Sequence, residues 1–399
     1  MRLSPSACQD RRVRAIDRTF SFRKERFTIS VIFLVHGLVV ASWVSRIPAI
    51  QSALGLSPAI LGTVLLSTTA GALVSMPLTG GLIHAFGSRR LVVVTTVFFC
   101  LSLPLLSHPG SAAGLAVSLF IFGAAAGGMD VSMNVQAAEF ERKRREPVMS
   151  SFHGLFSLGG MLGSAIGGAV AQRGLGPSPH FTLASLTFLV LAGSVLPWLS
   201  PGTSRSESSL TLHFDRRILV LGAIGFCVLL GEGAMADWTA VYLHGSLGSS
   251  PGLAALGYSV FSASMAGGRF LGDWLTRALG RAWLVRAGSL LAAFGVLSAI
   301  LVENVAVALV GFALVGAGFS TIVPIIFGAS ASVRGVPAGT GVAAVTTAGY
   351  LGFLLGPPLI GWTAQLTTLR AALSLVAVLS LVAAFLAKGL KANTIEIDD

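Results

Sequence analysis

The chain has 399 residues, of which 54% are hydrophobic and only 11% are charged, and it carries a formal net charge of +11. Its mean hydropathy is +0.82. Soluble domains contain roughly 25% charged residues, so this composition excludes the ordinary soluble class. In a membrane protein, an excess of Lys and Arg reflects topology and anionic lipid headgroups rather than binding of nucleic acid.

The chain opens with a basic segment, residues 1–26, which contains eight Lys and Arg residues. The apolar run after it is longer than the hydrophobic region of a signal peptide. It leads to Arg46 and Pro48 rather than to a small-residue cleavage site. We therefore expect a cytoplasmic tail and not a cleaved leader.

Twelve apolar stretches follow, and each approaches the roughly 20 residues that a helix needs to cross a bilayer. We predict an all-α membrane protein with transmembrane helices near 27–47, 58–83, 91–108, 113–138, 150–172, 181–199, 218–243, 253–276, 283–302, 305–330, 338–364 and 369–388. The expected domains are a tail at 1–26, a six-helix bundle at 27–199, a cytoplasmic linker at 200–217, a six-helix bundle at 218–388 and a cytoplasmic tail at 389–399.

The basic residues alternate sharply between successive connections. Of the 27 Lys and Arg residues, 24 fall on one side of the series, and only Arg46, Arg173 and Arg370 fall on the other. The basic side of this count includes Arg269, together with the arginines that follow it up to Arg286. Because basic connections stay in the cytoplasm, we expect both termini to be cytoplasmic.

The two halves of the sequence repeat at a nearly constant offset of 193–195 residues. The matched pairs are Trp43 with Trp238, Gly62 with Gly257, Gly87 with Gly280, Gly123 with Gly316, and Gly163 with Gly356. A parallel repeat of two six-helix units is typical of transporters that bind their substrate near the membrane midplane and move their halves around it.

The connection after the second predicted span, Gly80-Gly81-Leu82-Ile83-His84-Ala85-Phe86-Gly87-Ser88-Arg89-Arg90, resembles the major facilitator superfamily signature G-x-L-x-D-R-x-G-R-R. His84 stands where the signature has an acidic residue. The second half carries Asp273 and then Gly280-Arg281 at the equivalent turn. The resemblance implies a conformational-switch loop formed by Gly80, His84, Gly87, Arg89, Arg90, Asp273, Gly280 and Arg281. Simple charge anchoring by the two adjacent arginines is the alternative.

Three further segments resemble the fucose:proton symporter-like branch of that superfamily and its bacterial inner-membrane relatives. They are Ser42 to Pro48, Gly127 to Asn134, and Gly316 to Ser320 with Pro324. The resemblance covers the chain from residue 27 and is specific for the fold, whereas it does not transfer sugar specificity.

Ionisable side chains at membrane depth are costly and therefore mark functional sites. His36, Asp130 and Glu232 lie about 14, 12 and 21 Å from the cytoplasmic ends of their predicted helices at about 1.5 Å per residue. Asp130 and Asn134 are four residues apart on one helical face, and the pair suits hydroxyl recognition or proton exchange. Glu232, between Gly231 and Gly233, is a candidate coupling carboxylate.

Each of these candidates has a structural alternative. Asp130 and His36 could serve as interhelical hydrogen-bond partners, although histidine also titrates closest to neutral pH and suits a proton relay. The glycines beside Glu232 indicate close packing or a local helix break. Trp43, seven residues from His36, would either stack on a sugar ring or anchor the helix at the outer interface. Asp237 is a candidate outer gate.

Other classes of protein find little support in the sequence. Cys8, Cys100 and Cys227 are scattered and indicate neither a disulfide framework nor a metal site. The chain has no Walker-type or H-E-x-x-H motif and no segment large enough for a soluble output domain, so we expect neither an enzyme nor a sensor, and no cofactor. Energy for transport would come from an ion gradient or from the gradient of the substrate itself.

The sequence therefore predicts a secondary active transporter of a small polar solute such as a sugar. We expect proton coupling and alternating access, in a monomer embedded in the lipid bilayer. A proton-driven exporter of amphipathic compounds remains the alternative, because central polar residues are few.

Overall fold

The computed structural model describes residues 5–144, 148–201 and 215–388, with side chains from residue 22 onward. The described chain is helical throughout. Its α-helices are α1 (Pro5–Val44), α2 (Ile47–Ala53), α3 (Pro58–Phe86), α4 (Ser88–Ser102), α5 (Ala112–Arg144), α6 (Met149–Gln172), α7 (Pro177–Val195), α8 (Arg216–Val241), α9 (Pro251–Leu279), α10 (Arg281–Leu301), α11 (Val305–Phe319), α12 (Ile322–Ser330), α13 (Ala338–Leu366) and α14 (Leu369–Leu386). Short 3₁₀ turns follow α4 and α7, and a π-turn, Tyr242–Ser246, follows α8.

All twelve predicted spans are helical, and eleven helical segments of the described chain are long and apolar enough to cross a membrane. The segment outside that group is α9. It has 29 residues, but Arg269, Asp273 and Arg277 lie within it, which lowers its apolar character. The prediction of an all-α, multi-span membrane protein is thus confirmed.

The second helix of each half begins and ends in the same way. Ser57 caps α3 by accepting a hydrogen bond from the Ile60 N–H, and Ser250 caps α9 by accepting one from the Leu253 N–H. Both helices have 29 residues. They end at Gly87 (φ 82°, ψ 149°) and Gly280 (φ 81°, ψ 150°). This left-handed φ favours glycine, so the glycines of the repeat have a conformational role.

The predicted span at 305–330 is divided into two helices. Helix α11 ends at Phe319 and α12 begins at Ile322, on either side of Ser320 and Thr321. Pro324 has no N–H to donate to the Ser320 carbonyl, and its ring would clash with that carbonyl in a regular helix. Pro324 therefore accounts for the interruption four residues before it.

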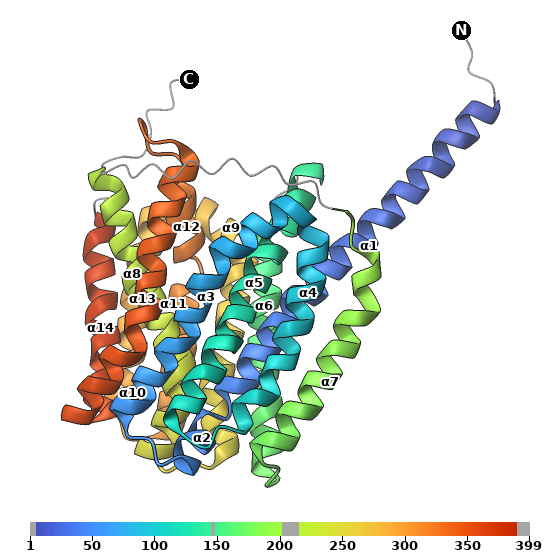
Figure 1. The fold of residues 1–399 in the computed structure, drawn as a ribbon. Helices are drawn as coiled ribbons and strands as arrows, with labels where there is room; N and C mark the ends of the chain where they lie inside the picture. Colours follow the sequence, from blue (N-terminus) through green and yellow to red (C-terminus); the bar gives the residue numbers. More distant parts are fainter. Residues whose placement is uncertain (1–4, 145–147, 202–214, 389–399) are drawn as a thin grey trace.

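The helices form one bundle in which the first half, α1–α7, meets the second half, α8–α14, along two principal interfaces. Helix α3 packs against α13, and α6 packs against α9. In Figure 1 the blue-to-green helices lie at the right and the yellow-green-to-red helices at the left. We call the end with the Gly87 and Gly280 turns the terminal face, since α1 begins and α14 ends on that side (Figure 1). The opposite end, with α2, is the far face.

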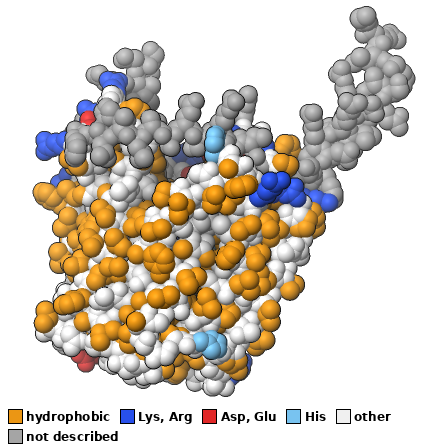
Figure 2. All heavy atoms as spheres, viewed as in Figure 1, with side chains coloured by type: hydrophobic (Ala, Val, Ile, Leu, Met, Phe, Trp, Pro, Cys, Tyr) orange, Lys and Arg blue, Asp and Glu red, His pale blue; other side chains and the backbone are white. Residues whose placement is uncertain are grey.

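The surface of the bundle fits a membrane environment. Figure 2 shows hydrophobic side chains over the middle of the visible face and a group of Lys and Arg near the terminal face. Large apolar residues such as Phe98, Val190 and Phe385 are well exposed on the helix exteriors. Such extensive exposed apolar area marks contact with lipid rather than with water.

The predicted tail and linker are described only in part. Helix α1 is continuous from Pro5 to Val44, so the backbone of residues 5–26 extends the first span as a helix. Of the predicted linker 200–217, residues 202–214 lie outside the described residues, as does the predicted tail at 389–399.

Candidate functional site

Asp130 lies on α5 and is contacted from the second half. Its Oδ1 accepts a hydrogen bond of 3.1 Å from Asn134 Nδ2, as expected for residues one helical turn apart. Its Oδ2 accepts a hydrogen bond of 3.4 Å from the Tyr350 hydroxyl on α13. The carboxylate is therefore shared by a local amide and a phenol from the other half.

Glu232 lies on α8 and forms an ion pair with Arg269 on α9. Glu232 Oε2 is 3.8 Å from Arg269 Nη2, and the two side chains are only 15% and 11% exposed. Arg269 Nη1 reaches the first half, where it donates to Ser157 Oγ at 2.7 Å and to the His153 carbonyl oxygen at 3.4 Å, both on α6. One guanidinium thus contacts a carboxylate of its own half and helix α6 of the other.

The two glycines beside Glu232 are explained by close packing. A Cβ at Gly231 would meet the Phe319 ring of α11, and a Cβ at Gly233 would meet the Phe353 ring of α13. Helix α8 is continuous through this point. The local helix break that was one of the two predictions for Gly231 and Gly233 is therefore wrong. The second carboxylate oxygen, Oε1, is buried and accepts no hydrogen bond from the described residues.

His36 is buried in α1 among aromatic rings. Its ring lies 5.0 Å from that of Phe99 and 5.4 Å from that of Phe156 between centroids. Neither ring nitrogen has a hydrogen-bond partner among the described residues. The interhelical hydrogen bond considered for His36 is therefore absent from the described contacts, whereas its role as a relay stays a prediction.

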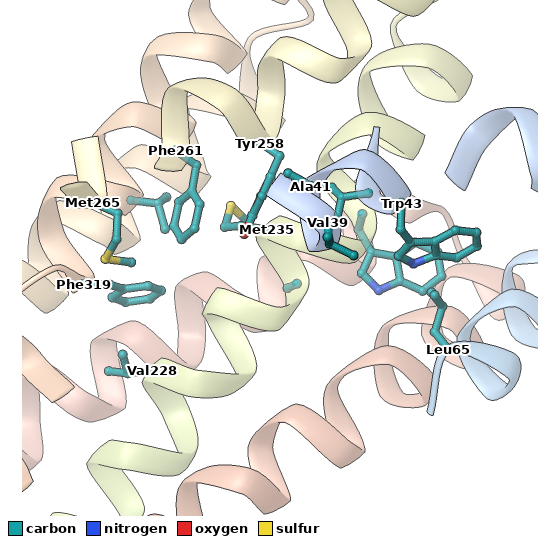
Figure 3. Close-up of a cluster of buried hydrophobic side chains, with 14 of the residues drawn as sticks. Val39, Ala41, Trp43, Leu65, Val228, Met235, Tyr258, Phe261, Met265 and Phe319 are labelled. Atoms are coloured by element: carbon teal, nitrogen blue, oxygen red, sulfur yellow. The ribbon is translucent and has the colours of Figure 1, made fainter. Parts of the chain in front are cut away.

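Trp43 and Asp237 lie on the far-face side of these groups. Trp43 is 3% exposed, which does not fit an interfacial anchor, and Figure 3 shows it beside Leu65. Asp237 is half-buried on α8 next to the fully buried Trp238. Tyr258 on α9 lies close enough to Glu232 and Asp237 to interact electrostatically with both.

The predicted conformational-switch loop lies on the terminal face. Arg89 donates a hydrogen bond of 3.2 Å to the Pro197 carbonyl, whereas His84 is exposed at the end of α3. Asp273 and Arg281 of the second half line a cavity of about 160 Å³ at the same face. Arg269, Thr276 and Thr321 also line that cavity, so it leads toward the buried ion pair.

The far face is closed by direct contacts between the halves. A Cβ at Gly62 on α3 would clash with the Pro357 carbonyl of α13, and a Cβ at Gly361 on α13 would clash with the Pro58 carbonyl of α3. These helices touch through their backbones.

Between α6 and α9 the far-face contact is made by polar groups. Ser164 Oγ donates to the Ala255 carbonyl at 2.7 Å, and the Gly252 N–H donates to Gln172 Oε1 at 3.1 Å. Both interfaces are therefore closed at these contacts, and a separate hollow of about 280 Å³ lies at the far face between the segments Pro48–Leu56 and Val241–Gly245.

Apolar side chains surround the polar groups. Figure 3 shows a buried cluster that joins α1 and α3 of the first half to α8, α9 and α11 of the second. Met235 and Tyr258 lie together in it beside Val39 and Ala41. The polar residues near the bundle centre are thus few and separated by apolar contacts.

Sequence reasoning selected both carboxylates and paired Asp130 with Asn134, but it missed their partners on other helices. Arg269 was counted with the basic connections, which is wrong, since it lies inside α9 and pairs with Glu232. Its position within the predicted span 253–276 was a signal that could have identified it. Tyr350 and Ser157 carried no such signal, because hydroxyl groups are common in membrane helices.

Comparison with known proteins identifies the family. The model of the Major Facilitator Superfamily matches residues 29–349. The chain belongs to the Major Facilitator Superfamily. This membership agrees with the resemblance of the Gly80–Arg90 connection and with the arrangement of the helices.

Two relatives align with this chain over most of their own length. An uncharacterised MFS-type transporter of Yersinia pestis is 38% identical over 88% of this chain and 92% of its own length. The membrane protein MosC of Rhizobium meliloti is 34% identical over 89% of this chain and 88% of its own. The protein is thus a multi-pass membrane protein of a transporter family.

Two solved structures share the fold of this superfamily member. The nucleoside transporter NupG aligns with a TM-score of 0.73 and 12% identity over 92% of this chain and 99% of its own. A bacterial homologue of the lysosomal transporter Spinster, in an inward-facing and occupied conformation, aligns with a TM-score of 0.75 and 15% identity over 94% of this chain and 97% of its own.

Proposed function

We propose that the protein is a secondary active transporter that works by alternating access, is coupled to protons, and carries a small polar solute such as a sugar or related metabolite. One observation carries this proposal. Each half places a half-buried carboxylate, Asp130 or Glu232, in a network that reaches the other half, through Tyr350 or Arg269. Carboxyl groups at this depth can bind protons or solute, and both networks must rearrange when the halves move.

The proposal includes twelve spans in two related bundles. Helix α9 packs against α6 and α11 like an integral member of the bundle, which supports counting it as the eighth span. The matching ends of α3 and α9 support a common origin of the halves. The positive-inside rule then puts the terminal face and both termini in the cytoplasm of a bacterial inner membrane. The protein would act as a monomer.

The conformation described here would exchange solute with the cytoplasm. Backbone contacts at Gly62 and Gly361 close the far face, whereas the cavity beside Arg269 opens at the terminal face. Alternating access would require the first set of contacts to break as the second end closes.

The test uses reconstituted full-length protein and begins with a solute library. A thermal-shift screen at two pH values finds candidate ligands, and uptake into proteoliposomes follows for each. We expect uptake to depend on a proton gradient and to fall at least tenfold in Asp130→Asn and Glu232→Gln variants. Glu303→Gln is the matched control, because Glu303 pairs with Arg370 on exposed surface away from the centre. Counterflow that is unchanged in both central variants would contradict the site assignment.

One observation favours a second candidate, a proton-driven exporter of amphipathic compounds. The apolar cluster of Figure 3, with Phe261, Met265 and Phe319, offers a flexible surface to an apolar ligand. Thermal shifts caused by lipophilic cations and not by sugars would support the exporter, and the reverse pattern would support the solute transporter.

A further inference from the structure

Arg269 is the residue that connects Glu232 to the first half of the molecule. Its Nη2 faces the Glu232 carboxylate at 3.8 Å, and its Nη1 donates to Ser157 Oγ at 2.7 Å and to the His153 carbonyl at 3.4 Å. A guanidinium can hold two such partners at once because its donors lie in a fixed planar fork.

Glu232 is in ion-pair contact with this cation, whereas Asp273, one turn further along α9, and Arg281 line the cavity beside it. Helices α11 and α12 contain no Asp, Glu, His, Lys or Arg, and the titratable residue of α13 is Tyr350, which bonds Asp130. From α9, Tyr258 faces the pair, and from α6 His153 does. On α8 itself the other acid is Asp237, which interacts with Tyr258. Glu232 is thus the acid in ion-pair contact with Arg269 among the described residues.

Loss of the Glu232 charge would leave the guanidinium without an ion-pair partner at its buried position, whereas Asp273 offers a negative charge in the cavity. A buried ion that loses its partner is strongly destabilised, far more than a surface ion. Arg269 has a route to water, since it also lines the cavity of about 160 Å³ at the terminal face. Moving there would withdraw the guanidinium from Ser157 and the His153 carbonyl.

We propose that Arg269 is a positioning residue that couples the protonation of Glu232 to the contact between α6 and α9. With Glu232 ionised, the neutral pair keeps the guanidinium buried and holds α6 at the terminal face. With Glu232 protonated, the guanidinium turns to the cavity, the α6 contacts are released, and the terminal face opens further. This inference rests on the proposed function, in which Glu232 takes up a proton.

The experiment measures opening of the terminal face without any solute. Spin labels are placed at Phe86→Cys and Leu279→Cys, the exposed last residues of α3 and α9, in full-length protein that carries Cys8→Ser, Cys100→Ala and Cys227→Ala. Distances between the labels are measured by pulsed electron paramagnetic resonance in lipid nanodiscs from pH 5 to pH 8. We expect the population with the longer distance to rise at least tenfold at low pH.

Variants test whether the pair of Glu232 and Arg269 causes this change of label distance with pH. Glu232→Gln should show the long distance at every pH, because it leaves the cation unbalanced. The double variant Glu232→Gln with Arg269→Gln should show no response to pH, because neither the titrating carboxylate nor the guanidinium bridge to α6 remains. Glu303→Gln, which breaks an exposed Glu–Arg pair, should keep the wild-type response. The tenfold response should also persist in Asp237→Asn.

Three results would overturn the inference. A wild-type pH response in Glu232→Gln, or its loss in Asp237→Asn, would mean that another group controls the distance. Arg269→Lys keeps the charge but lacks the planar fork, so a full wild-type response in that variant would show that bridging to α6 is not involved.

Proton-driven uptake in proteoliposomes separates the two proposals. If uptake falls in Glu232→Gln while the label distances in the same variant still respond to pH, the inference about Arg269 fails and the proposed function stands. If the distances behave as expected while no solute is driven by protons, only the proposed coupling fails.

Discussion

The two ends of the interface between the halves are built differently. At the far face, α3 and α13 meet backbone to backbone at Gly62 and Gly361, with no room for a Cβ. Toward the terminal face, the halves meet through side chains of α9, with Arg269 on Ser157 and the Phe270 ring against Gly154, beside a cavity. A close backbone contact is either made or broken as a whole, whereas a charged side chain can replace a protein partner by water. The difference indicates a closed far face and an adjustable terminal face.

The largest expected effect comes from filling the backbone contact. Gly62→Leu would place side-chain atoms against the Pro357 carbonyl, and overpacking of this kind costs about 1–3 kcal/mol in the closed state. Spin labels at Ala53→Cys and Ser246→Cys on the far face should therefore report at least a fivefold gain of the longer distance. Gly81→Leu on the same helix is the control, because a Cβ there meets nothing within 4 Å. Equal distances in the two variants would show that this contact does not hold the far face shut.

A glycine contact inside one half should behave differently. A Cβ at Gly123 on α5 would clash with the Thr68 carbonyl on α3, and both helices belong to the first half. Gly123→Ala should lower stability by about 1–3 kcal/mol, seen as a lower melting temperature, because both conformations contain this contact. The far-face distance should stay at its wild-type value. A longer distance would mean that the halves do not move as units.

The equivalent caps of α3 and α9 allow a comparison between the halves themselves. Ser57→Ala and Ser250→Ala each remove a side-chain hydrogen bond to the first turn, worth about 1 kcal/mol. Thermal unfolding should show similar losses for both variants. A loss confined to one of them would argue against equivalent roles of the two helices.

The smallest effect should come from the exposed edge of the far-face contact. Trp362 Nε1 donates to Thr63 Oγ1 at 3.1 Å, at an exposed site. Trp362→Phe removes that hydrogen bond and keeps an aromatic ring, so the far-face equilibrium should shift by about 0.5 kcal/mol, or roughly twofold. Thr63→Val should give the same shift in the distance measurement. A tenfold shift in either variant would make this edge as important as the backbone contact.

The fold followed from the sequence because membrane helices satisfy their own backbone hydrogen bonds, so apolar length locates them directly. Asp130 and Glu232 could be selected from the sequence because charged side chains at membrane depth are rare. Their partners depend on which helices meet, and no local pattern reports that Tyr350 faces α5 or that Arg269 contacts Glu232 and α6. The interruption of the predicted span 305–330 was not predicted. Its one sign in the sequence is Pro324, and the effect of this proline depends on the position of the Ser320 carbonyl in the folded helix.

The most direct test of alternating access compares two distances in the same protein. One pair of spin labels, Ala53→Cys and Ser246→Cys, spans the halves at the far face, and the other pair, Phe86→Cys and Leu279→Cys, spans them at the terminal face. Within each pair the two positions are 193 residues apart, which is also the separation of Gly87 and Gly280. The account predicts that conditions or variants that lengthen the far-face distance shorten the terminal-face distance. Distances that lengthen together, or that never change, would contradict it.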